Sequence, residues 1–148
     1  MITFTIKKFN DLTPHELYAI LRLRSEVFVV EQTCVFLDMD NKDQLCYHLT
    51  AWDSDLLAGY TRLVPPGIAF KFPSVGRVVT SPHVRNKGMG KIIMEKSIEE
   101  IFNLFGKTSI RIGAQLYLKK FYESFGFIQT GNIYDEDGID HIEMTREN

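Results

Sequence analysis

The residues best suited to chemistry form a short glycine-rich loop between a predicted strand and a predicted helix. They are Arg85, Asn86, Lys87, Gly88, Met89 and Gly90, followed by Lys91. Glycines let the backbone turn tightly and approach a ligand closely. The first amides of a helix have no intrahelical partner and lie at the positive end of its dipole. With the three cationic side chains they predict a diphosphate site, although the loop alone is equally typical of an ordinary helix N-terminus.

Two better-known phosphate-binding loops are excluded by the residues and their order. A Walker A loop needs Gly-x-x-x-x-Gly-Lys followed by Ser or Thr. Here Gly90 and Lys91 are followed by Ile92, and the earlier glycine is missing. A dinucleotide-binding fold carries its glycines after the first strand of a mostly parallel sheet, whereas this loop follows four predicted strands. The chain therefore fits neither class.

Apolar periodicity, helix caps and turn signals predict one α/β domain over residues 1–148. The first helix starts with Thr13 as N-cap and Glu16 completing a capping box, and a mostly apolar stripe that includes Arg24 runs on to Phe28. Two more helices are expected over 87–105 and 115–125, each stopped by a glycine. Strands are expected over 2–6, 45–52, 56–64, 75–80, 108–113, 127–134 and 139–145.

Composition and charge narrow the class of protein. Seventeen Lys and Arg against nineteen Asp and Glu give a net charge of −2, which argues against a general nucleic-acid binder. The only cysteines are Cys34 and Cys46, and no Cys/His group has zinc-site spacing, so no metal is expected. No apolar run approaches the roughly 20 residues that cross a bilayer, and residues 1–9 lack a signal-peptide pattern. We therefore expect a cytoplasmic protein that makes no membrane contact.

Two sequence blocks make the chain resemble the Gcn5-related N-acetyltransferase (GNAT) superfamily over nearly its whole length. The first is the strand, the Arg85-x-x-Gly88-x-Gly90 loop and the helix, and the second is Gln115 followed by the block from Phe121 to Phe127. The family usually has Asn at the Gln115 position. Residues 28–34, 76–79 and 137–144 are similar to the ElaA-like branch. The resemblance implies an α/β fold with a mixed central sheet of about seven strands, splayed between strands 4 and 5 and flanked by helices.

The resemblance also implies a co-substrate, acetyl-CoA, and the residues that contact it. The loop from Arg85 to Lys91 would hold the diphosphate. The pantetheine arm would pair with backbone groups of Val78, Val79 and Thr80. Gln115 and Tyr117 are further candidate contacts, although Tyr117 is equally typical of an exposed helix position. The implied reaction is direct transfer of the acetyl group to a primary amine of a small molecule or a peptide. The alternative is a non-catalytic acyl-CoA-binding sensor or interaction module, and a homodimer is common in the family.

The transfer needs an acid and a base. Tyr122 matches the family's catalytic tyrosine and is the candidate acid. With a phenol pKa of about 10 and a thiol pKa of about 8.5, protonation of the leaving thiolate is uphill by roughly 2 kcal/mol, which a general acid tolerates. Helical spacing from Leu118 to Phe125 is also typical of a core aromatic at position 122. An alkylammonium pKa of about 10.4 means that the amine must lose a proton, and the candidate bases are Glu31, His48 and His141.

Acceptor contacts are harder to assign from the residues. Arg77 and His141 are candidate substrate-binding residues, and Arg77 alternatively pairs with an acidic side chain. The acidic segment after residue 34 contains Asp38, Asp40 and Asp43. Together with Glu31, these carboxylates either attract a cationic acceptor or form a solvated acidic loop. The sequence does not name the acceptor.

Overall fold

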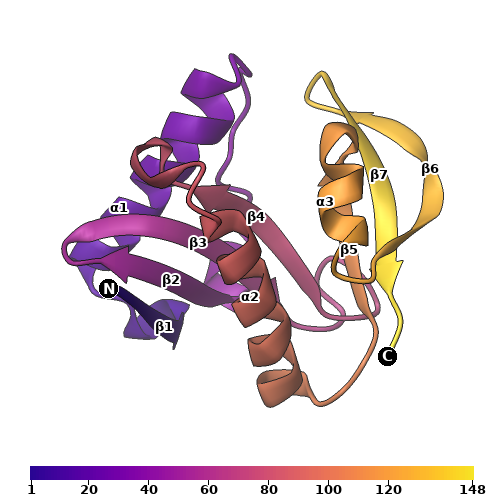
Figure 1. Cartoon of the computed structure of the whole chain (residues 1–148), viewed down its shortest axis with the longest axis horizontal. Coiled ribbons are helices and arrows are strands. Elements are labelled where there is room, and N and C mark those ends of the chain that lie inside the picture. Colours follow the sequence, from indigo (N-terminus) through magenta and orange to yellow (C-terminus); the bar gives the residue numbers. More distant parts are fainter.

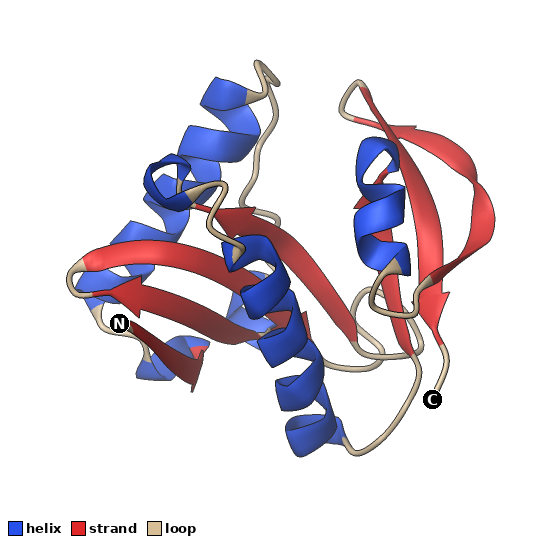
Figure 2. Cartoon of the chain, viewed as in Figure 1, coloured by secondary structure: helices blue, strands red, loops and turns tan.

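The computed structural model describes residues 1–148 and has the predicted order of strands and helices (Figures 1 and 2). None of the helices combines the length and apolar character needed to cross a membrane. The elements in chain order are β1 (Ile2–Lys8), α1 (Pro14–Arg24), β2 (Tyr47–Asp53), β3 (Leu56–Val64), β4 (Ser74–Thr80), α2 (Met89–Phe105), β5 (Ile110–Gln115), α3 (Lys119–Glu123), β6 (Ile128–Glu136) and β7 (Ile139–Arg146).

The seven strands form two sheets that separate between β4 and β5. The first sheet has the order β1-β2-β3-β4 and the second β5-β7-β6, with antiparallel neighbours throughout. Where β4 and β5 begin, Arg111 donates its backbone N–H to the Pro73 carbonyl at 3.1 Å. From there the two strands diverge (Figure 1). The predicted splay between the fourth and fifth strands is therefore confirmed.

Two helices cover opposite faces of the first sheet. Ile93, Met94 and Ile101 of α2 belong to a core that includes residues of both sheets. Leu57 and Val79 instead belong to a smaller cluster with Ile20, Leu23 and Val27 of the α1 region. Because successive strand residues point to opposite faces, α1 and α2 pack on the two sides of β3 and β4. Both helices thus fix the position of β4 beside the opening.

Local departures from the predicted boundaries have identifiable causes. The capping box of Thr13 and Glu16 is present, but α1 ends at Arg24 and continues as a π-helical segment, η2 (Ser25–Glu31). Helix α2 begins at residue 89 rather than 87, because the preceding Gly88 has a φ of 75°. The third predicted helix is shorter, since β5 runs on to Gln115 in register with β7 and a 3-10 turn over 116–118 precedes α3.

Candidate active site

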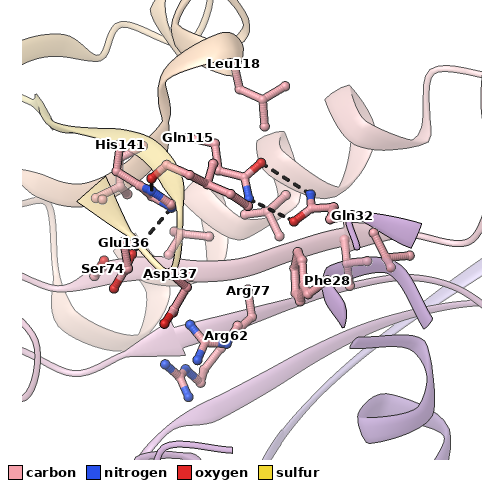
Figure 3. A pocket seen from close by; sticks show the side chains of 18 of the residues that line it. Phe28, Gln32, Arg62, Ser74, Arg77, Gln115, Leu118, Glu136, Asp137 and His141 are labelled. Carbon is pink, nitrogen blue, oxygen red and sulfur yellow. Dashed lines mark hydrogen bonds and ion pairs between the residues drawn. The ribbon is translucent and has the colours of Figure 1, made fainter. Parts of the chain in front are cut away.

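A cavity of about 750 Å³ lies where the two sheets diverge. This volume is within the range typical of small-molecule sites, about 300–1,000 Å³. Several predicted site residues line the cavity. They are the cofactor contacts Val78, Val79 and Thr80 on β4 and Gln115 at the end of β5, the predicted acid Tyr122, and one predicted acceptor contact on each sheet, Arg77 and His141. The structure therefore brings together residues that lie far apart in the sequence (Figure 3).

The glycine-rich loop presents a helix start with free amides. Gly88 is the N-cap of α2, and no side chain caps the helix. The first helical hydrogen bond runs from the Ile92 amide to the Gly88 carbonyl at 3.1 Å, so the three preceding amides have no intrahelical partner. Asn86 also has a positive φ, 66°. The exposed side chains of Lys87 and Lys91 add positive charge at this end.

Arg85 of this loop has a partner that the sequence did not reveal. Its Nη1 lies 2.6 Å from Oε1 of Glu31, and both side chains are more than one-third exposed. Glu31, predicted as a base, therefore lies at the loop as the counter-ion of Arg85. Both residues line the cavity. An anionic ligand at the loop has to compete with this carboxylate.

The next residue, Gln32, bridges the opening between the two sheets. Its side-chain amide donates to Gln115 Oε1 at 3.4 Å, and the Gln115 amide donates back to Gln32 Oε1 at 3.2 Å (Figure 3). Gln115 ends β5, whereas Gln32 follows η2. The reciprocal pair holds the η2 end against the second sheet. The longer Gln at position 115, compared with the usual Asn, makes this contact.

Tyr122 is a buried aromatic that also lines the cavity. Its ring packs edge-on against Phe121 and Phe127, at centroid distances of 5.1 and 6.1 Å. The side chain is only 6% exposed and still lines the cavity. Burial, with a smaller contribution from Tyr117, raises the pKa of Tyr122 well above its ordinary value. The phenol therefore keeps its proton at neutral pH. Tyr117 itself is 70% exposed and also lines the cavity.

The two strand histidines have different surroundings. Nδ1 of His48 lies 2.7 Å from the Tyr60 hydroxyl, and Nε2 lies 2.9 Å from the Asp43 carbonyl. Because a carbonyl only accepts, Nε2 carries the proton and the Nδ1 lone pair is used by Tyr60. Burial lowers the pKa of His48, and the residue is not among those that line the cavity. This arrangement argues against the prediction of His48 as the general base.

His141 lines the cavity, and its two ring nitrogens have different partners. Its Nδ1 lies 2.7 Å from the Ile139 carbonyl, so Nδ1–H is the donor. Nε2 lies 3.4 Å from Oε2 of Glu136 (Figure 3). The ring stacks on Tyr134 at a centroid distance of 5.7 Å. A fixed Nδ1–H tautomer leaves the Nε2 lone pair as the site that accepts a proton.

The acidic segment is neither solvated nor free, in contrast to both predictions for it. Three aspartates and three arginines alternate in a closed ring of ion pairs, here called the Arg–Asp ring. Arg24, Asp38, Asp43 and Arg62 are all buried. The contacts around the ring are Arg24–Asp38 (2.7 Å), Asp38–Arg77 (2.8 Å), Arg77–Asp40 (3.5 Å), Asp40–Arg62 (2.8 Å), Arg62–Asp43 (3.0 Å) and Asp43–Arg24 (2.8 Å).

The arginines of the ring keep Asp40 and Asp43 ionised. Burial opposes ionisation of Asp40 and Asp43, but hydrogen bonds and positive charge from the arginines outweigh it, so the pKa of each carboxyl lies below its usual range. Arg77 pairs with acidic residues, which was one of its two predicted roles, and it also lines the cavity. Arg24 and Arg62 were not predicted as site residues. The available signal was a charge on an otherwise apolar stripe of α1 and on the apolar strand β3.

The split sheet and the cavity at its opening are the architecture of CoA-dependent acyltransferases. The chain belongs to the GNAT family, because the model of the acetyltransferase (GNAT) domain matches residues 14–148. This confirms the resemblance drawn from the loop and the Phe121–Phe127 block.

Several relatives resemble the chain over nearly its full length. Protein ElaA of Escherichia coli is 37% identical over 149 residues, covering 99% of this chain and 97% of ElaA. The ElaA crystal structure matches with a TM-score of 0.92 at 36% identity, covering 99% of this chain and all of that one. An acyl-CoA N-acyltransferase from Pseudomonas aeruginosa matches with a TM-score of 0.94 at 38% identity, covering 99% of both chains. A GNAT acetyltransferase of Elizabethkingia anophelis with acetyl-CoA bound shares the fold at 18% identity and a TM-score of 0.64, covering 99% of this chain and 98% of that one.

Proposed function

We propose that the chain transfers an acetyl group from acetyl-CoA to a primary amine by direct attack. The observation that carries the proposal is one cavity lined by both Arg85 of the glycine-rich loop and Tyr122, the residue that matches the family's acid. The acyl-CoA N-acyltransferase of P. aeruginosa and the acetyl-CoA-bound protein of E. anophelis support the choice of co-substrate.

The residues present fit an acyl-CoA. The free amides at the start of α2, with Arg85, Lys87 and Lys91, are suited to a diphosphate. Strand β4 pairs only with β3, apart from the Arg111 contact beside its first residue. Its backbone over 78–80 is therefore available to amide groups of a pantetheine arm. Gln115 at the opposite wall is a further donor and acceptor for the same arm.

Tyr122 is proposed to donate the proton that the leaving thiolate needs. When bound, acetyl-CoA supplies a thioester, in which a C–S bond is exchanged for a C–N bond to the amine. The Tyr122 hydroxyl is the proton source on the thiolate side; it is protonated at neutral pH, and its raised pKa makes the transfer more uphill than with an ordinary phenol. Burial and Tyr117 raise the pKa, and no hydrogen bond to the Tyr122 hydroxyl takes part. A positioned general acid typically contributes about 10²–10⁴-fold in rate.

His141 is proposed to accept the proton from the attacking amine, directly or through a water. The Ile139 carbonyl fixes the tautomer, and Glu136 lies beside Nε2. Once the ring is protonated, Oε2 of Glu136 at 3.4 Å is its ion-pair partner. Glu31 is a weaker candidate because its carboxylate is paired with Arg85.

Calorimetric titration with acetyl-CoA, CoA, ATP and NAD tests the class of ligand. We expect binding of acetyl-CoA and CoA but not of ATP or NAD. Gly88→Glu should abolish this binding, because it places a carboxylate at the diphosphate site. Gly106→Glu is the matched control, since Gly106 also has a positive φ and open space around it but lies at the other end of α2. Failure of the wild-type chain to bind acetyl-CoA would refute the proposal, and binding without acetylation of any amine would favour the sensor alternative.

A further inference from the structure

The aspartates of the Arg–Asp ring have no free capacity for a cationic ligand. Each of their six carboxylate oxygens lies within 3.2 Å of an arginine nitrogen. Asp40 Oδ1 also accepts the backbone amide of Lys42 at 3.1 Å. A cationic group could bind here only by displacing an arginine. The acidic residues of this segment therefore do not make an ammonium site.

Three buried polar atoms at the ring make no hydrogen bond: Asp38 Oδ1 and the Nε atoms of Arg62 and Arg77. Asp38 Oδ1 and Arg77 Nε face each other as an ion pair at 2.8 Å, so the groups left without any partner are donors. Arg62 is 5% exposed and lines the cavity, yet its Nε has no hydrogen-bond partner. Arg77 uses Nη2 on the Asp38 carbonyl and Nε on the Asp38 carboxylate, and its Nη1 makes no ion pair or hydrogen bond. Lys42 lines the same end of the cavity, and its ammonium group is unpaired. This end of the cavity is thus rich in hydrogen-bond donors.

The backbone at Arg77 forms a β-bulge and has a positive φ. One residue of β3, Thr61, faces two residues of β4, Arg77 and Val78, because the register shifts between Tyr60 and Arg62. Arg77 has a φ of 50°, a conformation that costs free energy for a residue with a side chain. A β-bulge of this kind redirects a side chain. The side chain at this bulge is that of Arg77, whose guanidinium belongs to the Arg–Asp ring and lines the cavity.

We propose that the donor-rich end of the cavity binds a carboxylate of the acetyl acceptor, so that the acceptor is an amino acid rather than a simple amine. This rests on the proposed acetyl transfer. Arginine N–H groups in a buried site match a planar carboxylate. Figure 3 shows Arg62 and Arg77 next to each other on one side of the cavity, with Gln115 and His141 on the opposite side. An acceptor anchored by its carboxylate directs its amine toward the side that carries His141.

Matched pairs of acceptors test this inference. Each pair is an amino acid and the amine left by removing its carboxylate, such as leucine with 3-methylbutylamine, phenylalanine with phenethylamine, and γ-aminobutyrate with propylamine. We expect kcat/KM to be about 10- to 100-fold higher for the amino acid in at least one pair, the range of one charge-assisted hydrogen bond. The gain should appear mainly in KM, since the carboxylate takes no part in the bond changes of the transfer.

Arg77→Gln should reduce the ratio of kcat/KM within that pair to near one, and Arg77→Lys should retain part of it. Both members of a pair are measured on the same variant, so a loss of folded protein cancels in the ratio. Arg22→Gln is the matched control, because Arg22 is an exposed residue of α1, and the wild-type ratio should persist. A wild-type ratio in Arg77→Gln would overturn the assignment of Arg77.

The outcomes separate this inference from the proposed function. If the decarboxylated amines are acetylated as well as the amino acids throughout the set, the carboxylate site is wrong while acetyl transfer stands. The same conclusion follows if acetyl-CoA binds in the calorimeter but no amino acid is acetylated. Absence of acetyl-CoA binding overturns both.

Discussion

Replacing Arg24 by Met should destabilise the fold strongly while leaving its shape intact. Arg24 is 0% exposed and contacts two buried carboxylates, Asp38 and Asp43. Removing one partner of a buried ion pair typically costs about 3–5 kcal/mol, because the remaining charge is left uncompensated. The entropy of unfolding is about 2.1 cal/mol/K per residue, so about 0.3 kcal/mol/K for a chain of this length. The melting temperature should therefore fall by about 10–16 °C.

Thermal unfolding without ligands, at fixed pH and salt, measures this change. Arg22→Met is the control, because Arg22 lies on the same helix with 68% of its side chain exposed and a loose pair to Glu26. Exposed pairs contribute about 0–1 kcal/mol, so the control should lose no more than about 3 °C. A loss of less than about 3 °C in Arg24→Met would show that Asp38 and Asp43 do not need Arg24 to compensate their charge.

The same variant should change the acid sensitivity of the fold. The folded-state pKa of Asp43 is held low by Arg24 and Arg62 against the opposing effect of burial. A carboxyl with a lowered folded pKa contributes stability above its ordinary pKa and loses it as the pH falls through the folded value. Without Arg24 the folded pKa of Asp43 rises toward or above its unfolded value, so the folded state takes up the proton more readily and urea midpoints should fall less steeply with falling pH than in the wild type. Parallel pH curves for the two proteins would contradict this reasoning.

Three further substitutions test the candidate active site and strand β5, which lines it. Tyr122→Phe should lower kcat by about 10²–10⁴-fold with nearly unchanged acetyl-CoA affinity, and wild-type turnover would remove Tyr122 as the acid. Glu31→Gln should strengthen acetyl-CoA binding about two- to fivefold at low salt, since an exposed pair with Arg85 contributes up to about 1 kcal/mol; unchanged calorimetric affinity would mean that the two anions do not compete. Gly113→Ala places a methyl group 2.6 Å from the Tyr134 hydroxyl and should cost about 1–3 kcal/mol. Adding Tyr134→Phe to Gly113→Ala removes the hydroxyl and should restore part of the melting temperature. If it does not, the clash with Tyr134 is not the cause of the lost stability.

Local signals predicted most of the fold. The capping box at Thr13, the glycine stops after the second and third helices and the alternating strands all act over a few residues, so each can be recognised in a short window of sequence. The phosphate-type loop is equally local, from Arg85 to Gly90. The predicted ends of helices and strands were less accurate where pairing between distant strands determines them. β5 extends to Gln115 because β7 pairs with it, which no window around residue 115 contains.

The Arg–Asp ring could not be predicted because its members come from four separate segments of the chain. Asp38 and Asp43 resemble residues of a solvated loop until Arg24 and Arg62 are placed beside them. The two histidines show the same limit. His48 and His141 both lie on strands, but only the arrangement of the sheets decides that His141 lines the cavity and that His48 is enclosed by Tyr60 and Asp43.

The divergence of β4 and β5 has a consequence for the ligand-free chain. Each strand is the last of its sheet, so each presents a row of backbone groups with no neighbouring strand. Open sheet edges are templates on which another chain can pair, and proteins usually blunt them with charge, a bulge or a cover. The bulge at Arg77 and the bridge between Gln32 and Gln115 protect this opening in part. A ligand with amide groups would complete the protection by taking the place of a missing strand, so occupancy and resistance to aggregation should rise together.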